Sequence, residues 1–95
     1  MGFIVVLFLE FPADKVDDIK SKLLNAAAIY RKDPETVEWN VQQDLTDSKK
    51  ITLVEKYERE SSLTDIHRKN PIYQETIDLI TSNVSKPIEK HFIHH

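Results

Sequence analysis

The sequence contains no cysteine and only one glycine among its 95 residues. Without cysteine there is no disulfide framework, no thiol nucleophile and no thiolate metal site. Phosphate-binding loops and dinucleotide-binding fingerprints need several glycines, so a single glycine argues against both. The composition therefore directs attention to titratable and aromatic side chains for any chemistry that the protein performs.

An excess of basic charge is also missing, because the formal net charge is −3. Nucleic-acid-binding domains usually carry a basic patch, so we expect no nucleic-acid partner. The longest apolar run, Phe3 to Leu9, is too short to span a bilayer, and no small-residue cleavage site follows it. We therefore expect a soluble, cytoplasmic protein without a membrane partner, folded as a single domain over residues 1–95.

Two hydrophobic periodicities alternate along the chain. Strand patterns cover residues 3–9, 36–44, 51–58 and 88–93. Helical patterns begin after Asp14 and after Ser62, and a further helical run follows Asn70-Pro71. This order, β-α-β-β-α-β, predicts an α+β, ferredoxin-like fold in which helices cover one side of an antiparallel sheet.

Local signals predict where the helices begin and end. Asp14 is expected to cap the first helix, and Ser62 with Asp65 approximates a capping box for the second. Proline disfavours a helical residue before it, so Asn70-Pro71 should end or kink that helix. The first helix should face the core with five residues at helical spacing: Val16, Ile19, Leu23, Ala27 and Tyr30.

Alternation assigns faces to the two middle strands. Val37, Trp39 and Val41 should face one way. The next strand should place Glu55 on the same face as its apolar neighbours Ile51, Leu53 and Tyr57. A buried carboxyl has a raised pKa and can act as a base. A salt bridge or an exposed sheet rim is the competing interpretation of Glu55.

The first strand is apolar on both faces. Helices on one side of the sheet would cover only one of them, and strands of this kind are normally covered on both. We therefore expect a homodimer in which a second copy covers the other face. A loop or the C-terminal tail of the same chain is the alternative cover.

His67, at the edge of an apolar helix face, is the leading candidate for proton transfer, because imidazole titrates near neutral pH. A half-buried histidine whose nitrogens are satisfied by the backbone is the competing interpretation. Trp39, Tyr57 and Tyr73 could line an apolar pocket and offer a polar tip, or simply pack in the core.

No metal site is expected. His91, His94 and His95 lie near the C-terminus, without the spaced partners of a structural zinc site. The last two are excluded as site residues because terminal histidines are common remnants of tags.

Three segments together resemble the antibiotic biosynthesis monooxygenase (ABM) family. They are Val54-Glu55-Lys56-Tyr57, the stretch from Leu63 to Tyr73, and Glu38-Trp39-Asn40-Val41. The resemblance implies a ferredoxin-like homodimer, the dimeric α/β barrel, in which strands of two subunits form a joint barrel. Members include cofactor-independent oxygenases of quinols and polycyclic phenols, haem degraders and an isomerase of a phosphosugar, and several have no known activity.

The matching positions distinguish these branches. Some oxygenases carry tryptophan at the position of His67 and a functional tyrosine at that of Tyr73. The haem degraders carry a histidine ligand near Ile77 and an asparagine on the first strand, and neither is present here. The isomerase-like branch shares the histidine at His67 but often has a second histidine at the position of Ile72.

The resemblance therefore implies a monooxygenase-like oxidoreductase without a cofactor, acting on a small aromatic or quinol. His67 and Tyr73 would be catalytic, and Trp39, Glu55 and Tyr57 would contact the substrate. A non-catalytic dimeric module that binds a small molecule or a partner, and a phosphosugar isomerase, stay open as alternatives.

Overall fold

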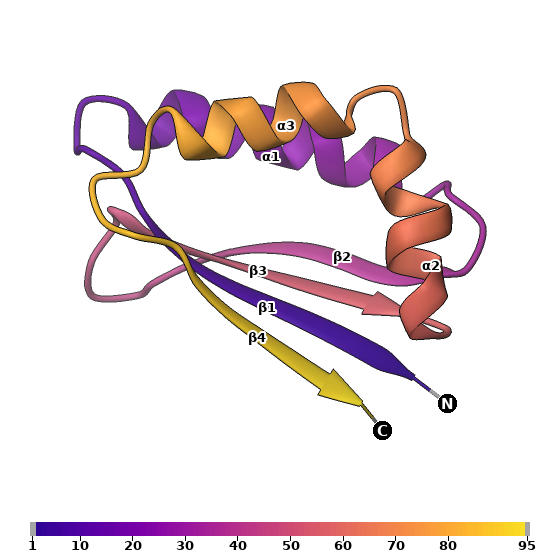
Figure 1. The fold of residues 1–95 in the computed structure, drawn as a ribbon. Coiled ribbons are helices and arrows are strands. Elements are labelled where there is room, and N and C mark those ends of the chain that lie inside the picture. The colour runs from indigo at the N-terminus through magenta and orange to yellow at the C-terminus, as the bar shows by residue number, and fades with distance from the viewer. Residues whose placement is uncertain (1, 95) are drawn as a thin grey trace.

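Four strands form one antiparallel sheet, and all the helices cover the same face of it (Figure 1). The computed structural model describes residues 2–94. The strands are β1 (Phe3–Glu10), β2 (Thr36–Gln43), β3 (Lys50–Tyr57) and β4 (Glu89–His94), in the sheet order β2-β3-β1-β4. The helices are α1 (Val16–Tyr30), α2 (Glu60–Asp65) and α3 (Tyr73–Thr81), and a 3₁₀ turn, η1 (His67–Lys69), follows α2. This arrangement confirms the predicted ferredoxin-like fold.

The core lies between the sheet and the helices. Alternate residues of β1 and β3 point into it, as the period of two predicts. The five α1 residues expected to face the core are all buried, and Leu23 is fully inaccessible. Burying one leucine side chain contributes about 1.5–3 kcal/mol, so this helix face is a main source of stability.

The outer face of the sheet is the one opposite the helices. It carries Ile4 and Val6, which are half-buried, and Phe8, which is 45% exposed. No loop or tail packs over this face among the described residues, because the C-terminal segment joins the sheet edge as β4 (Figure 1). β1 is therefore apolar on both sides although the described chain covers only one.

The expected helix caps are wrong. The N-cap of α1 is Lys15, with no side-chain cap hydrogen bond, so Asp14 does not cap the helix. Ser62 lies inside α2, which already begins at Glu60, and its Oγ donates to Glu35 Oε1 at 2.7 Å. This tertiary contact uses the hydroxyl that a capping box would need.

One facing prediction in β2 is also wrong. The pairing of β2 with β3 is interrupted by a bulge between Thr36 and Glu38. A bulge adds one residue to a strand and breaks the alternation locally. Val37 is therefore 60% exposed, whereas Trp39, after the bulge, is buried as expected.

The predicted break at Asn70-Pro71 is confirmed, because the chain is extended at Asn70 between η1 and α3. Asn70 Nδ2 donates to both carboxylate oxygens of Asp33, at 2.9 and 3.0 Å, and the backbone N–H of Ile72 donates to Asn70 Oδ1 at 3.0 Å. These bonds tie the break to the loop after α1. They fix the relative positions of His67 and Tyr73, on either side of the break.

No helix among residues 2–94 combines the length and apolar character needed to cross a membrane.

Neighbouring leucines on α1 test the direction in which the helix faces. Leu23→Ala should lower the free energy of unfolding by about 2–4 kcal/mol, because it opens a cavity in the core. Leu24→Ala is the matched control, since Leu24 is 47% exposed and should change stability by under about 1 kcal/mol. Urea denaturation followed by circular dichroism measures both, and equal losses would contradict the assigned facing.

Candidate active site

The five site residues predicted from the sequence converge on one region beneath the helices. Each of the elements β2, β3, η1 and α3 contributes at least one of them. Four are buried and one, at the start of α3, is half-buried. The five are Trp39, Glu55, Tyr57, His67 and Tyr73.

The imidazole of His67 lies inside an aromatic cage. Its ring centroid is 4.3 Å from that of Tyr30, 5.3 Å from Tyr73, 5.5 Å from Tyr57 and 6.3 Å from Trp39. Only 4% of His67 is exposed. The cage holds the ring in one place and keeps water away from it, which decides its protonation state.

Glu55 is the centre of the polar contacts in this region. The Tyr57 hydroxyl donates to Glu55 Oε1 at 2.5 Å. Tyr57 lies two positions after Glu55, on the same face of β3. His67 Nε2 lies 3.6 Å from the same oxygen. That distance is too long for a good hydrogen bond, so the two side chains are close without a hydrogen bond between them. Both side chains of this pair are only 5% exposed.

Burial shifts the pKa values of Glu55 and His67 in opposite directions. Burial raises the pKa of Glu55 to about 7, and the Tyr57 hydroxyl, the nearby Trp39 indole N–H and the charges of Lys90 and Arg68 only partly oppose this. Burial lowers the pKa of His67 to about 4. Both shifts arise because a low-dielectric site disfavours the carboxylate and the imidazolium alike.

Between about pH 4 and pH 7, Glu55 is therefore a protonated, neutral carboxyl and His67 is a neutral imidazole. The near-neutral titration expected of His67 belongs to Glu55 instead. Burial also raises the pKa of Tyr57 far above its usual range, so this phenol stays a hydrogen-bond donor. Above about pH 7, Glu55 is a buried base.

The buried region keeps unused hydrogen-bonding capacity. Among residues 2–94, His67 Nδ1 finds no hydrogen-bond partner. Buried polar groups are usually paired, so an unpaired one calls for an explanation. His67 can therefore still bind a polar group through Nδ1.

A cavity of about 140 Å³ adjoins this pair. Glu55, His67 and Tyr73 line it, whereas Trp39 and Tyr57 are not on its wall and lie behind the pair. A cavity of roughly 150 Å³ holds one benzene molecule, so this space suits a single aromatic ring. Most of the wall is aliphatic or aromatic: Val5, Leu7, Leu63, Ile77, Ile80, Ile88 and Phe92.

Sequence reasoning missed three residues of this site. Tyr30 was expected only as a core residue of α1, although it is the nearest ring to His67. Arg68 and Lys90 also line the cavity. The strand alternation that groups Lys90 with Ile88 and Phe92 was a usable signal for Lys90. No pattern in the sequence indicated that Arg68 would reach the cavity.

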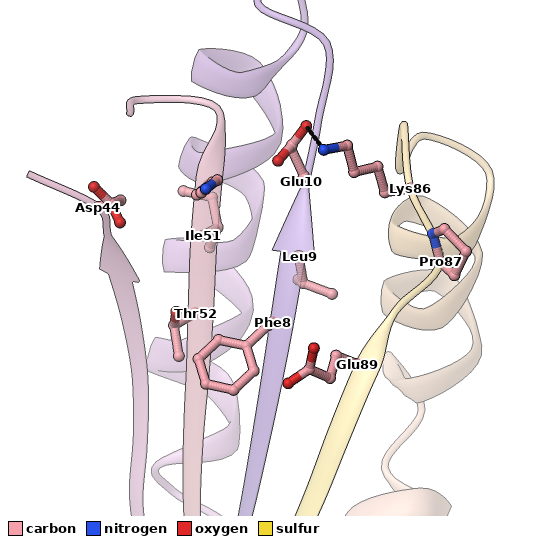
Figure 2. Close-up of a pocket in the computed structure, with 10 residues that line it drawn as sticks. Phe8, Leu9, Glu10, Asp44, Ile51, Thr52, Lys86, Pro87 and Glu89 are labelled. Atoms are coloured by element: carbon pink, nitrogen blue, oxygen red, sulfur yellow. Dashed lines mark ion pairs between the residues drawn. The ribbon is translucent and has the colours of Figure 1, made fainter. Parts of the chain in front are cut away.

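A larger cleft of about 420 Å³ lies elsewhere, between the end of β1 and the starts of β3 and β4 (Figure 2). Several of its polar groups are already engaged: Lys86 Nζ lies 3.5 Å from Glu10 Oε2, and Asp44 accepts hydrogen bonds from Thr46. None of the buried titratable groups lines it. Size alone therefore does not identify the chemical site.

No group of three His, Cys, Asp or Glu side chains within residues 2–94 is arranged to hold a metal ion. Among the described residues that line the small cavity, Glu55 and His67 are the only carboxyl and imidazole groups.

Comparison of the whole fold with solved structures gives high similarity at low identity. A Nitrosomonas europaea protein described as an antibiotic biosynthesis monooxygenase superimposes with a TM-score of 0.91 at 14% identity, covering 99% of this chain and 89% of that one. Another antibiotic biosynthesis monooxygenase gives a TM-score of 0.88 at 12% identity, covering 98% and 97%. The chain has the antibiotic biosynthesis monooxygenase fold.

A conserved protein from Methanosarcina mazei shares the ABM fold with this chain, with a TM-score of 0.86 at 20% identity over 98% of this chain and 91% of that one. No protein-family model and no curated protein sequence matches the chain. At these identities the similarity establishes the fold, and the chemistry depends on the site itself.

Opposite pH dependences of stability test the two pKa shifts. The folded pKa of Glu55 is raised from 4.5, so its contribution to stability should fall by about 3 kcal/mol as pH rises from 4.5 to 7. The folded pKa of His67 is lowered from 6.5, so its contribution should rise by a similar amount, about 3 kcal/mol, as pH rises from 4 to 6.5.

Urea denaturation of the wild type, Glu55→Gln and His67→Gln across this pH range measures both contributions. The stability of the wild type relative to Glu55→Gln should decrease with pH, and that relative to His67→Gln should increase. Using differences removes the background of other ionisable groups. A flat difference for either variant would refute the corresponding shift.

Proposed function

We propose that this protein catalyses the cofactor-independent oxygenation of a small, single-ring phenol or quinol. The observation that supports this most is a buried carboxyl, Glu55, whose pKa of about 7 places it ready to accept a proton at the wall of a one-ring, largely apolar cavity. Catalytic bases are most effective when their pKa lies near the working pH.

The reaction needs a base because a phenol reacts with oxygen only as its electron-rich anion. In the proposed sequence, the ring hydroxyl gives its proton to the Glu55 carboxylate. The phenolate reduces O₂ and forms a new ring carbon–oxygen bond, giving a ring hydroperoxide. The O–O bond then breaks and the ring C–H proton is lost, which yields a quinone and one water molecule. Phenol and O₂ supply all the atoms of these products.

The chain supplies three further functions in this proposal. The Tyr57 hydroxyl donates to Glu55 Oε1 and orients the carboxylate. Neutral His67 lies 3.6 Å from the same oxygen and keeps Nδ1 available to bind a polar group of the substrate. Tyr73 lines the cavity with its ring roughly perpendicular to that of His67, in a position to contact the substrate ring.

The fold comparison supports the proposal, since two of the similar structures are named as antibiotic biosynthesis monooxygenases. The largely apolar interior of the cavity fits a phenol ring better than the hydroxyl groups of a phosphosugar. The isomerase alternative would use the same proton-transfer pair on a more polar substrate, and it would consume no oxygen.

Oxygen uptake with a panel of hydroquinones tests the catalytic role of Glu55. Glu55→Gln should lower turnover by about 10²–10⁴-fold, the usual effect of losing a general base. In the wild type, kcat/KM should rise with pH through about 7 as Glu55 loses its proton. This rise should be absent from the residual activity of the variant.

Glu58→Gln is the matched control, because Glu58 is exposed and lies three positions along the chain. It should retain wild-type turnover. Full activity in folded Glu55→Gln would remove Glu55 as the base. Isomerisation of a substrate without oxygen uptake would replace the oxygenase proposal with the isomerase one.

We also propose that two copies associate through the outer face of the sheet. Its exposed apolar residues support this, since Phe8 and Ile93 are 45% and 46% exposed and lie beside half-buried Ile4 and Val6. A contiguous apolar surface of this kind is typical of an interaction site. Because β1 is central, a partner there would cover its second face.

Sedimentation at micromolar concentration should give twice the chain mass. Phe8→Lys should shift the protein to the monomer, because a buried unpaired charge at an interface is strongly unfavourable. Leu24→Lys is the control, since Leu24 is equally exposed but lies on α1. A monomeric wild type, or a dimer unaffected by Phe8→Lys, would contradict this interface.

A further inference from the structure

Two positively charged side chains at the rim of the small cavity take no part in the proposed proton transfer. Arg68 and Lys90 both line the cavity, and both are exposed to solvent. They come from η1 and β4, two elements that are far apart in the sequence. Within residues 2–94, no ion pair joins either side chain to a carboxylate.

The charge around the cavity is unbalanced. Glu55 is the only carboxylic acid among the described residues that line it, and it is protonated up to about pH 7. The fields of Lys90 and Arg68 reach this carboxyl, because both lower its pKa. The cavity therefore combines an apolar interior, a buried hydrogen-bonding end and a positively charged rim.

We propose that the substrate is a small aromatic acid, whose carboxylate binds to Arg68 and Lys90 while its ring hydroxyl faces Glu55. This rests on the proposed function and adds the substrate class. A guanidinium offers paired N–H donors that match a carboxylate, and a lysine adds a second positive charge. His67, with its unpaired Nδ1, lines the same cavity and offers a further polar contact.

The size of the cavity is consistent with a ring bound inside and a carboxylate bound at the rim. About 140 Å³ accommodates one ring, so a charged substituent on that ring would extend to the rim. An uncharged quinol would leave both cations solvated and would gain nothing from them. The two side chains therefore select between substrates that are equal in ring size and differ in charge.

Binding of hydroquinone and gentisate, which is hydroquinone with one added carboxylate, tests the inference. Isothermal titration calorimetry is performed without oxygen, so that no turnover is needed. Gentisate should bind the wild type about tenfold or more tightly than hydroquinone, the effect expected of charge-assisted hydrogen bonds. Added salt should weaken the binding of gentisate and leave that of hydroquinone unchanged.

The double variant Arg68→Gln/Lys90→Gln should lose this preference and bind both compounds alike. Lys69→Gln/Lys86→Gln is the matched control, because it removes the same charge from exposed residues that do not line the cavity. Inorganic phosphate, titrated as a competitor, distinguishes a site for any anion from one for an aromatic acid. Effective displacement of gentisate by phosphate at similar concentration would overturn the aromatic-acid assignment.

The inference is overturned if the wild type binds gentisate and hydroquinone equally or binds neither. It is also overturned if the double variant keeps the wild-type preference for gentisate. Oxygen uptake with gentisate is measured separately. Preferential binding of gentisate without oxygen uptake would support the anion-selecting rim and would count against the proposed oxygenase. The two proposals can therefore fail independently.

Discussion

The burial of Glu55 is the constraint on which the rest of the site depends. A carboxyl group on the core face of a strand is stable only if it is protonated or well paired. Here the Tyr57 hydroxyl and the His67 imidazole surround it, and burial raises the pKa of Glu55 to about 7. The same burial keeps His67 neutral, so the carboxyl is the group of the pair that titrates near neutral pH.

The sheet serves two purposes through its two faces. The helix-facing side holds both the core and the cavity with its polar pair, and the core residues Val5, Leu7, Leu63 and Ile80 also line the cavity. The opposite side presents apolar residues of β1 that the described chain does not cover. Because strand residues alternate between faces, Val5 and Leu7 line the cavity while Val6 between them lies on the outer face.

The helical layer is held to the sheet by contacts that also position the site. Asn70 joins the break after η1 to Asp33, and Ser62 joins α2 to Glu35 in the same loop. Glu35 has a positive φ of 65°, which is uncommon for a residue other than glycine. Its neighbours restrain it there, since Arg59 Nη1 lies 3.2 Å from its carboxylate. His67 is thus fixed from both sides.

The sequence by itself determined the order of elements, the core face of α1, the break at Pro71 and the strand face on which Glu55 lies, because periodicity and proline chemistry act over a few neighbouring residues. Only the tertiary structure decided the rest. Val37 turned outward at a bulge set by strand pairing, and Ser62 bonded to a residue 27 positions away instead of capping its helix. The opposite pKa shifts of His67 and Glu55 depend on desolvation by side chains from β2, α1 and α3, which no local pattern encodes.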